Sequence, residues 1–179
     1  MYGTLPVNKK VKKSQKTRTN EKAYNYIINS TNKKTEEYFM RAYTYVKPGL
    51  ASFVAVDKPV ICKPTDAIVR IVKTTICGTD LHIIKGDVPA CKNGMILGYE
   101  GIGIVEEVGA GVSNFKKGDK VLISCVCDCG KCYYCKKGIY AHCEDEGGWI
   151  FGHLIDGMQA EYLRVPHAYS LSHSLSHSS

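Results

Sequence analysis

The chain has 179 residues, 44% of them hydrophobic, and a formal net charge of +7 at pH 7. That length suits one domain of ordinary size, or one and a fraction, and the composition can supply a core. No apolar run approaches the 18 or so residues of a membrane-spanning helix, so the sequence argues against a membrane protein.

Most of the positive charge lies at the N-terminal end. Residues 1–39 contain nine Lys and Arg but three acids, whereas the remaining 140 residues carry 15 basic and 14 acidic side chains. The nearly neutral body disfavours nucleic acid as a partner. Because only residues 24–28 of the first 39 offer apolar continuity, the segment cannot offset a backbone ordering cost of about 1–2 kcal/mol per residue. We expect residues 1–39 to be disordered or marginally helical: a solvated extension, or alternatively a basic arm that contacts polyanions.

From residue 40 onward the pattern changes to short strands. Two β-rich runs, 40–46 and 50–56, flank Lys47-Pro48-Gly49 and predict a hairpin. Further strands are predicted at 66–75, which is rich in β-branched residues and expected to be largely buried, and at 98–111, 116–124 and 159–165. Short strands with turn signals and almost no long helix predict a mainly β fold, either a barrel or a sandwich.

One short helical turn interrupts this pattern. Cys77-Gly78-Thr79-Asp80 opens a turn that runs through Ile84, and Thr79 or Asp80 is placed to cap it.

The stretch GIGIVEEVGAG at 101–111 is similar in sequence to the glycine-rich phosphate-binding motif GxGxxG. That motif follows a strand and opens a helix, whereas here a strand pattern follows the first glycines. Gly101 and Gly103 therefore indicate close backbone approach or a bulge, and we reject a dinucleotide site in this chain.

The C-terminal end is a low-complexity repeat. After Tyr169 the chain reads SLSHSLSHSS, with LSHS occurring twice. His173 and His177 could be metal ligands, but a Ser/Leu/His repeat lacks the scaffold to aim them. We expect 170–179 to be an unstructured tail of a chain cut short, so that 159–165 is the last strand.

Residues 124–143 carry the strongest chemical signal, a C-x2-C-x2-C-x7-C pattern formed by Cys129, Cys132, Cys135 and Cys143. Two-residue gaps let thiolates turn inward around tetrahedral zinc, with Zn–S distances of about 2.3 Å. The alternatives are a disulfide cluster or buried free thiols. Nine cysteines is an odd count and no signal peptide precedes them, which argues for a reduced, cytoplasmic protein. Cys125 and Cys127 are then spare thiols, either of which could replace a ligand if the loop shifts register.

Together these segments resemble the N-terminal half of the zinc-dependent medium-chain alcohol dehydrogenases. The resemblance runs from about residue 40 to 169 and rests on four motifs in the family's order: ICGTDLHIIKGDVP (76–89), ILGYEGIGIVEEVGAGVSNFKKGDKVLISC (96–125), the four-cysteine lobe (124–143) and GHLIDGMQAEYLRVP (152–166). It implies a GroES-like, partly open β-barrel with short helices, from which a zinc lobe projects.

The resemblance also implies roles for three residues near the helical turn. Cys77 would be the first ligand of a catalytic zinc, Thr79 would bond the substrate alcohol oxygen, and His82 would relay its proton to solvent. Zinc lowers the pKa of a bound alcohol, and a histidine of near-neutral pKa can export the proton. Without the resemblance, Cys77 would be interpreted as a buried thiol and His82 as a surface residue.

Two features depart from the family pattern. The family's Gly-His-Glu, whose histidine is the second zinc ligand, appears here as Gly98-Tyr99-Glu100, and a phenol is a poor replacement for imidazole. Glu100 could bind the metal through oxygen. His153 and Asp156 are further candidate ligands, although the simpler interpretation is that these two residues shape a loop. The third zinc ligand and the Rossmann domain of the family have no counterpart before residue 169. We expect at most weak metal binding at this position.

Two functions remain in competition. One is the zinc-binding catalytic-domain portion of an alcohol dehydrogenase-like oxidoreductase, which would act on a small alcohol or carbonyl substrate and use NAD(P) only if a Rossmann domain is supplied. By family it would be an oligomer, and this chain alone is expected to be inactive. The other is a non-catalytic, zinc-stabilised module whose basic arm contacts polyanions or protein partners.

Overall fold

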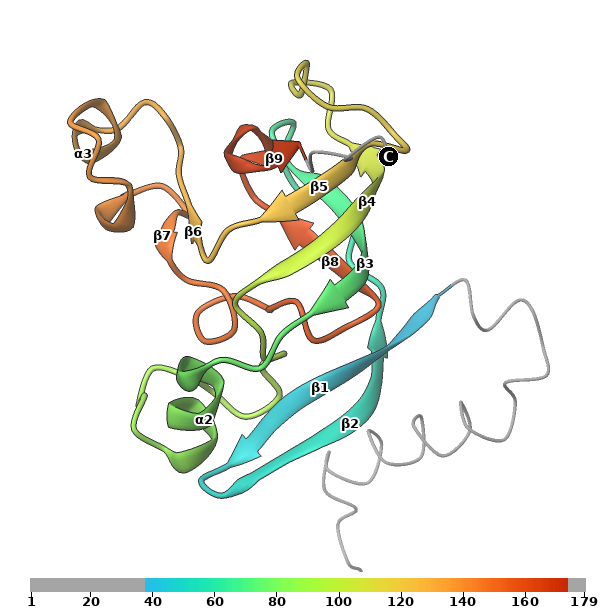
Figure 1. The fold of residues 1–179 in the computed structure, drawn as a ribbon, viewed down its shortest axis with the longest axis vertical. Coiled ribbons are helices and arrows are strands. Elements are labelled where there is room, and N and C mark those ends of the chain that lie inside the picture. Colours follow the sequence, from blue (N-terminus) through green and yellow to red (C-terminus); the bar gives the residue numbers. More distant parts are fainter. Residues whose placement is uncertain (1–37, 174–179) are drawn as a thin grey trace, which may run out of the picture.

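A five-stranded antiparallel sheet forms the centre of the computed structural model, which describes residues 38–173 (Figure 1). The strand order is β8 (Tyr162–Val165), β3 (Ala67–Thr74), β4 (Gly101–Val108), β5 (Lys120–Ile123) and β9 (Ser172–His173). Register shifts between Ile68 and Val69 and between Ile71 and Lys73 interrupt the β3–β4 pairing. Such bulges increase the local twist and bend, as in a sheet that curls toward a barrel. The mainly β fold predicted from the sequence is confirmed.

Gly103 shows why this sheet needs a glycine in a strand. A β-carbon at position 103 would collide with the Val69 side chain and the Arg70 carbonyl oxygen of the neighbouring strand. The glycine thus permits the close approach of β3 and β4 that its position predicts. Because β4 continues as a strand through Val108, GIGIVEEVGAG does not open a helix.

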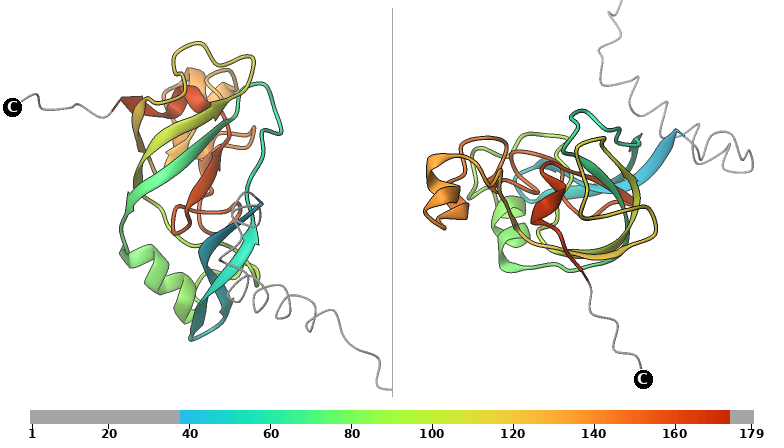
Figure 2. Two further views of the ribbon diagram at one scale, coloured as in Figure 1. Left: turned by 90° about the vertical axis from the view of Figure 1, so that its right-hand side faces the viewer. Right: turned by 90° about the horizontal axis from the view of Figure 1, so that it is seen from above.

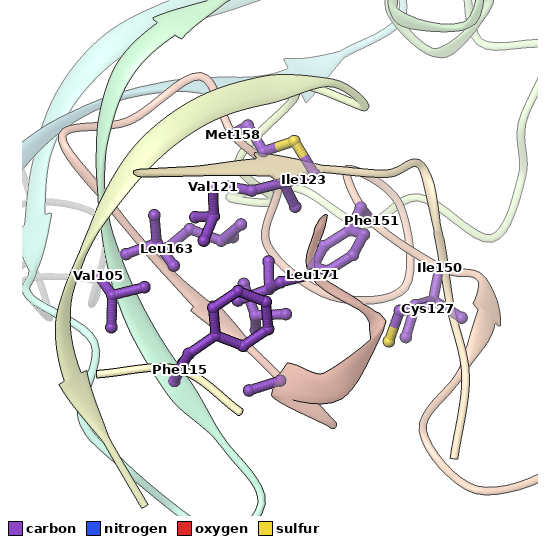
Figure 3. Close-up of a cluster of buried hydrophobic side chains, with 14 residues drawn as sticks. Val105, Phe115, Val121, Ile123, Cys127, Ile150, Phe151, Met158, Leu163 and Leu171 are labelled. Carbon is purple, nitrogen blue, oxygen red and sulfur yellow. The ribbon is translucent and has the colours of Figure 1, made fainter. Parts of the chain in front are cut away.

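The concave side of the sheet encloses the main core. Its buried side chains come from the strands and from the loops that connect them, and ten of them are labelled in Figure 3: Val105, Phe115, Val121, Ile123, Cys127, Ile150, Phe151, Met158, Leu163 and Leu171. In β4 and β5 buried and exposed residues alternate, which is the period of a strand with one face on a core. β3 is fully buried only in its first three residues, so the prediction of a largely buried strand holds for that half alone.

A long hairpin packs against the sheet and its loops. β1 (Phe39–Lys47) and β2 (Leu50–Asp57) pair antiparallel around Gly49, whose φ of 79° suits glycine, and the predicted hairpin is confirmed. Backbone bonds from Tyr43 to Gln159 (2.8 Å) and from Leu97 to Tyr43 (3.0 Å) join it to the body. The side chains of Arg41 and Glu161 add an ion pair at 2.8 Å.

The remaining elements are short. Helix α2 (Gly78–Lys85) follows β3, and the paired strands β6 (Val126–Cys127) and β7 (Gly148–Trp149) form the base of a loop that carries α3 (Tyr133–Lys136) and the 3-10 turn Tyr140–His142. This loop stands out to one side of the sheet (Figures 1 and 2). Across residues 38–173 no helix is long and apolar enough to cross a membrane.

The C-terminal prediction was wrong for residues 170–173. The chain does not end its folded part at Tyr169: a 3-10 turn, Ala168–Ser170, leads into β9, which pairs with β5. The physical reason is that Leu171 is buried in the main core while the backbone beyond it completes the sheet edge. Residues 174–179 and 1–37 lie outside the described residues, and with them the predictions of a disordered basic extension and of a ligand role for His177.

The strand predicted at 98–111 is also shorter than expected. It begins at Gly101, so Gly98, Tyr99 and Glu100 form an irregular segment before it. Within that segment Gly98 has φ 109°, and a β-carbon there would lie 2.7 Å from the backbone nitrogen of Gln159. The backbone turn immediately before Tyr99 therefore requires a glycine, both for its positive φ and for the close approach of Gln159.

Candidate functional site

Two places in the structure bring together the residue types that can hold a metal, and the first is the loop that the β6–β7 pair closes. Val126 pairs with Trp149 and Cys127 with Gly148, so both ends of the loop are fixed to each other. Gly147 permits this closure, because a β-carbon there would lie 2.5 Å from the Cys143 sulfur. The loop can therefore fold back on itself within about 20 residues of sequence.

Inside this loop the four cysteines of the C-x2-C-x2-C-x7-C pattern converge. The sulfur atoms of Cys129, Cys132, Cys135 and Cys143 all lie within 4.8 Å of one another. Cys129 Sγ and Cys135 Sγ are 3.9 Å apart, close to the edge of about 3.8 Å of a tetrahedron with Zn–S distances of about 2.3 Å. A disulfide requires about 2.05 Å, and none of the nine cysteines forms one. The geometry therefore favours a tetrathiolate metal site over the disulfide alternative.

Backbone amides point at these sulfurs. Cys129 N donates to Cys143 Sγ at 3.2 Å, Cys132 N to Cys129 Sγ at 3.3 Å and Cys135 N to Cys132 Sγ at 3.5 Å. Hydrogen bonds from Glu144 and Cys135 lower the pKa of Cys132 to about 6, whereas burial raises the pKa of Cys135 to about 12. Metal binding would therefore have to displace protons from the buried thiols, as is usual for thiolate ligands.

The two spare thiols lie elsewhere. Cys127 is buried in the main core and its thiol donates to the Pro166 carbonyl oxygen at 3.4 Å. Cys125 packs against a second cluster that contains Tyr99. Neither belongs to the sulfur group of the lobe, so the structure gives no support to a ligand exchange with them.

Contacts from the end of the domain fix the lobe in place. The Tyr169 hydroxyl donates to the Cys129 carbonyl oxygen, and His167 Nε2 contacts the Asp145 carbonyl oxygen at 2.6 Å. Lys131 Nζ lies 2.9 Å from the Asp145 carboxylate, and this hydrogen bond is the main reason that the pKa of Asp145 is lowered. Sequence reasoning missed Tyr169, because nothing in its local pattern points to a residue 40 positions earlier.

The second place surrounds the start of helix α2. Its N-cap is Cys77, and Asp80 at the third helical position accepts a hydrogen bond from Cys77 N at 2.9 Å. The prediction that Thr79 or Asp80 caps the helix is thus right for Asp80 only. Asp80 does so as the third helical residue of a capping box, in which its side chain accepts from the backbone N–H of the N-cap residue. Asp80 is buried, and its other oxygen accepts from Gly98 N at 2.9 Å. One carboxylate thereby joins α2 to the segment that carries Tyr99.

The proposed catalytic residues Thr79 and His82 lie on α2. Thr79 is half-buried in the first turn, and His82 is exposed one turn later. His82 Nδ1 lies 2.9 Å from the Asp87 carboxylate, whose pKa this hydrogen bond lowers, and Lys85 Nζ lies 3.4 Å from the same carboxylate. Sequence reasoning therefore missed the pairing of His82 with Asp87, which lies five residues later and just beyond the end of the helix.

Tyr99 occupies the interior of this second place. It is 2% exposed, and its hydroxyl lies 2.7 Å from His153 Nδ1. The Tyr99 ring stacks on Trp149, with ring centroids 5.4 Å apart and planes at 30°. Burial, reinforced by the charge of Asp80, raises the pKa of Tyr99, and burial lowers the pKa of His153. Both groups are therefore neutral near pH 7, as a phenol and an imidazole.

The other candidate ligands do not converge on Tyr99. The Glu100 carboxylate is exposed and contacts the Thr75 hydroxyl at 3.4 Å, while Asp156 Oδ1 accepts from Ile96 N at 3.2 Å. In the described part of the chain, the lobe cysteines form the only group of three or more candidate ligands within 4.8 Å of one another. The residues at this second place, Cys77 included, therefore do not fit a zinc ion.

Comparisons with known proteins agree with this architecture. The alcohol dehydrogenase GroES-like domain family matches residues 63–174. An uncharacterized zinc-type alcohol dehydrogenase-like protein, AdhB of Bacillus subtilis (strain 168), is 42% identical over 141 residues, covering 72% of this chain and 37% of the relative. An alcohol dehydrogenase of Cupriavidus necator is 39% identical over 145 residues, covering 72% of this chain and 39% of the relative.

Solved structures give the same result. The apo form of zinc-dependent alcohol dehydrogenase 2 from Streptococcus pneumonia has 85% sequence identity and a TM-score of 0.74, and the match covers 76% of this chain and 39% of that chain. Alcohol dehydrogenase TADH from Thermus sp. ATN1 has 37% identity and a TM-score of 0.68, with 75% and 40% covered. The chain thus spans 37% and 39% of the length of the two curated relatives.

Proposed function

Because the chain belongs to the alcohol dehydrogenase GroES-like domain family, we propose that it is the zinc-binding catalytic-domain portion of an alcohol dehydrogenase-like oxidoreductase. The observation that carries the proposal is the convergence of four cysteine sulfurs within 4.8 Å in the lobe. Zinc held by Cys129, Cys132, Cys135 and Cys143 would cross-link the loop and replace the hydrophobic core that a loop of this size lacks.

The proposed reaction of the complete enzyme is the oxidation of a small alcohol to an aldehyde or ketone with a nicotinamide cofactor. In it Thr79, half-buried at the start of α2, would hold the alcohol oxygen through its hydroxyl. His82 would pass the proton on: with Asp87 accepting from Nδ1–H, the other ring nitrogen is left to accept a proton on the exposed side. NAD(P) use is proposed only for an assembly that supplies a Rossmann domain.

We further propose a cytoplasmic location and, as for the family, an oligomer. The nine free cysteines support a reducing compartment, in which thiols persist as metal ligands. This chain alone is proposed to be inactive; in support, its glycine-rich stretch continues as strand β4 and does not open a phosphate-binding helix.

A non-catalytic, zinc-stabilised module is the second candidate, and the lack of converging ligands around Tyr99 favours it for the isolated chain. The experiment is to assay the purified chain with NAD or NADP and a series of small alcohols, and to measure its zinc content in parallel. One equivalent of zinc without turnover is the expected result. Turnover would exclude the module, salt-sensitive binding to a polyanion would favour it, and absence of zinc would contradict both candidates.

A further inference from the structure

We propose that Tyr99, through its hydrogen bond to His153, excludes metal from the place beside Cys77, so that this position is a packed junction between α2 and the loop that follows β7. The proposal goes beyond the lobe zinc and does not depend on it. It starts from the observation that the Tyr99 hydroxyl is inside the protein, 2.7 Å from His153 Nδ1, and not at the surface.

The packing around Tyr99 leaves its ring little freedom. Trp149 stacks on it, and the Trp149 ring also lies 4.1 Å from the His153 ring, centroid to centroid. On another side the backbone of Gly152 is so close that a β-carbon there would lie 3.1 Å from the Tyr99 ring. A rotation that withdrew the phenol would have to displace these neighbours together, because close-packed interiors have no spare volume.

Two polar groups close to Tyr99, the His153 imidazole and the Asp80 carboxylate, already make hydrogen bonds within the protein. His153 Nδ1 faces the Tyr99 hydroxyl and the Phe151 carbonyl oxygen, at 2.7 and 3.2 Å. The buried carboxylate of Asp80 accepts from the amides of Cys77 and Gly98. A catalytic zinc generally needs three protein ligands, and in the described part of the chain no group of three candidate ligands converges beside Cys77.

The segment just before Tyr99 is held by the same junction. Gly157 N donates to the Ile96 carbonyl oxygen at 2.8 Å and Gln159 N to that of Leu97, also at 2.8 Å. A β-carbon at Gly157 would collide with the carbonyl oxygens of Leu97 and Gly98. The loop that contributes His153 therefore lies directly on the segment that contributes Tyr99, and the pair closes the space between them.

The decisive experiment is a metal count on the full chain after dialysis against excess zinc. Cys77→Ser should leave the zinc content of the parent unchanged, whereas Cys132→Ala should remove its one equivalent. Loss of one equivalent in Cys77→Ser would overturn the proposal, since Cys77 would then hold a metal. A parent without any zinc would instead contradict the lobe site, so the two failures are distinguishable.

A second variant tests the part assigned to Tyr99. Tyr99→His places an imidazole beside Cys77 and removes the phenol that is bonded to His153 Nδ1, so that His153 becomes available as a third ligand. The zinc content should therefore rise toward two equivalents, about a twofold increase, and Cys77→Ser in that background should abolish the gain. Tyr45→His is the matched control, because Tyr45 is buried in the same cluster without a bond to His153, and it should gain no metal. Equal zinc contents in the parent and in Tyr99→His, whether one or two, would show that Tyr99 does not exclude the metal.

Discussion

The lobe and the Tyr99 junction begin in the same way and end differently. In each, a cysteine caps a short helix: Cys132 caps α3 and Cys77 caps α2. Three residues later the lobe has Cys135, whose sulfur turns toward the other thiols, whereas the junction has Asp80, whose two oxygens accept backbone amides. The same local turn thus presents a metal ligand in one case and a structural bond in the other.

The two regions also differ in how far along the chain their partners lie. All four lobe sulfurs come from one loop of 15 residues, 129–143, so local chain geometry alone brings them together. The junction joins Cys77, Tyr99, Cys125 and His153, which four separate segments contribute. The residue at position 99 therefore meets partners from other segments, whereas the four lobe ligands are all supplied by one loop.

The largest effect is expected for Cys132→Ala. The chain should lose its zinc, from about one equivalent to nearly none, and several kcal/mol in free energy of unfolding, because structural zinc contributes on the order of 10–16 kcal/mol in small peptides. Metal analysis and urea unfolding measure both quantities. Cys62→Ala, at an exposed cysteine outside the lobe, is the control and should change neither. Full zinc retention in Cys132→Ala would show that the lobe cysteines do not hold the zinc, and the contrast between the lobe and the junction would then fail.

Asp80→Ala should have the next largest effect, and it acts at the junction. The amides of Cys77 and Gly98 lose a buried acceptor, for which we expect a destabilisation of about 2–4 kcal/mol. Asp80→Asn keeps one acceptor oxygen and should lose less. Zinc content should be the same in both variants as in the parent. A variant that lost zinc would show that the two regions are not independent.

Tyr99→Phe isolates the hydroxyl of the junction. It should lower the free energy of unfolding by about 1–3 kcal/mol, since a buried hydrogen bond to His153 is removed while the ring stacking stays. Urea unfolding of zinc-saturated protein measures it, and Tyr140→Phe, at a half-exposed tyrosine of the lobe, should have no effect. A neutral Tyr99→Phe would mean that the ring alone holds the junction.

The smallest effect is expected for Asp156, close to the junction, where protonation of one carboxyl group makes the free energy of unfolding depend on pH. Burial raises the pKa of Asp156, so the folded state binds this proton more tightly than the unfolded state does. The stabilisation from that group is therefore complete below the pKa of an unfolded aspartate and is lost as the pH rises through the raised pKa. Asp156→Asn should remove this slope. The lobe should behave oppositely and gain zinc affinity with rising pH, because its thiols must lose protons.

Sequence reasoning works well where interactions are local. The cysteine spacing predicts the convergence of the lobe sulfurs, and the two β-rich runs around Pro48-Gly49 predict the hairpin, because both depend on residues a few positions apart. The four family motifs, present in the family's order, are enough to predict the GroES-like fold.

The rest depends on contacts between distant segments. Tyr99 and His153 are 54 residues apart, and no local pattern indicates that a phenol and an imidazole will meet. The same holds for Leu171, which low-complexity composition assigns to a tail but which the fold takes into its core. Asp80 is the intermediate case: its position three residues after Cys77 indicates the capping bond, but not the bond to Gly98.

The turn at Ala168–Ser170 has a consequence for hydrogen exchange. His167, just before the turn, and Tyr169, within it, are bonded to the lobe. Ala168 and Leu171 are packed in the core, and β9 completes the sheet edge beside Val121 and Leu122. We therefore expect the lobe, the turn and this sheet edge to open cooperatively. Removal of zinc should accelerate amide exchange at the edge of the sheet as well as in the loop, so protection of the β5–β9 amides becomes a remote readout of metal occupancy.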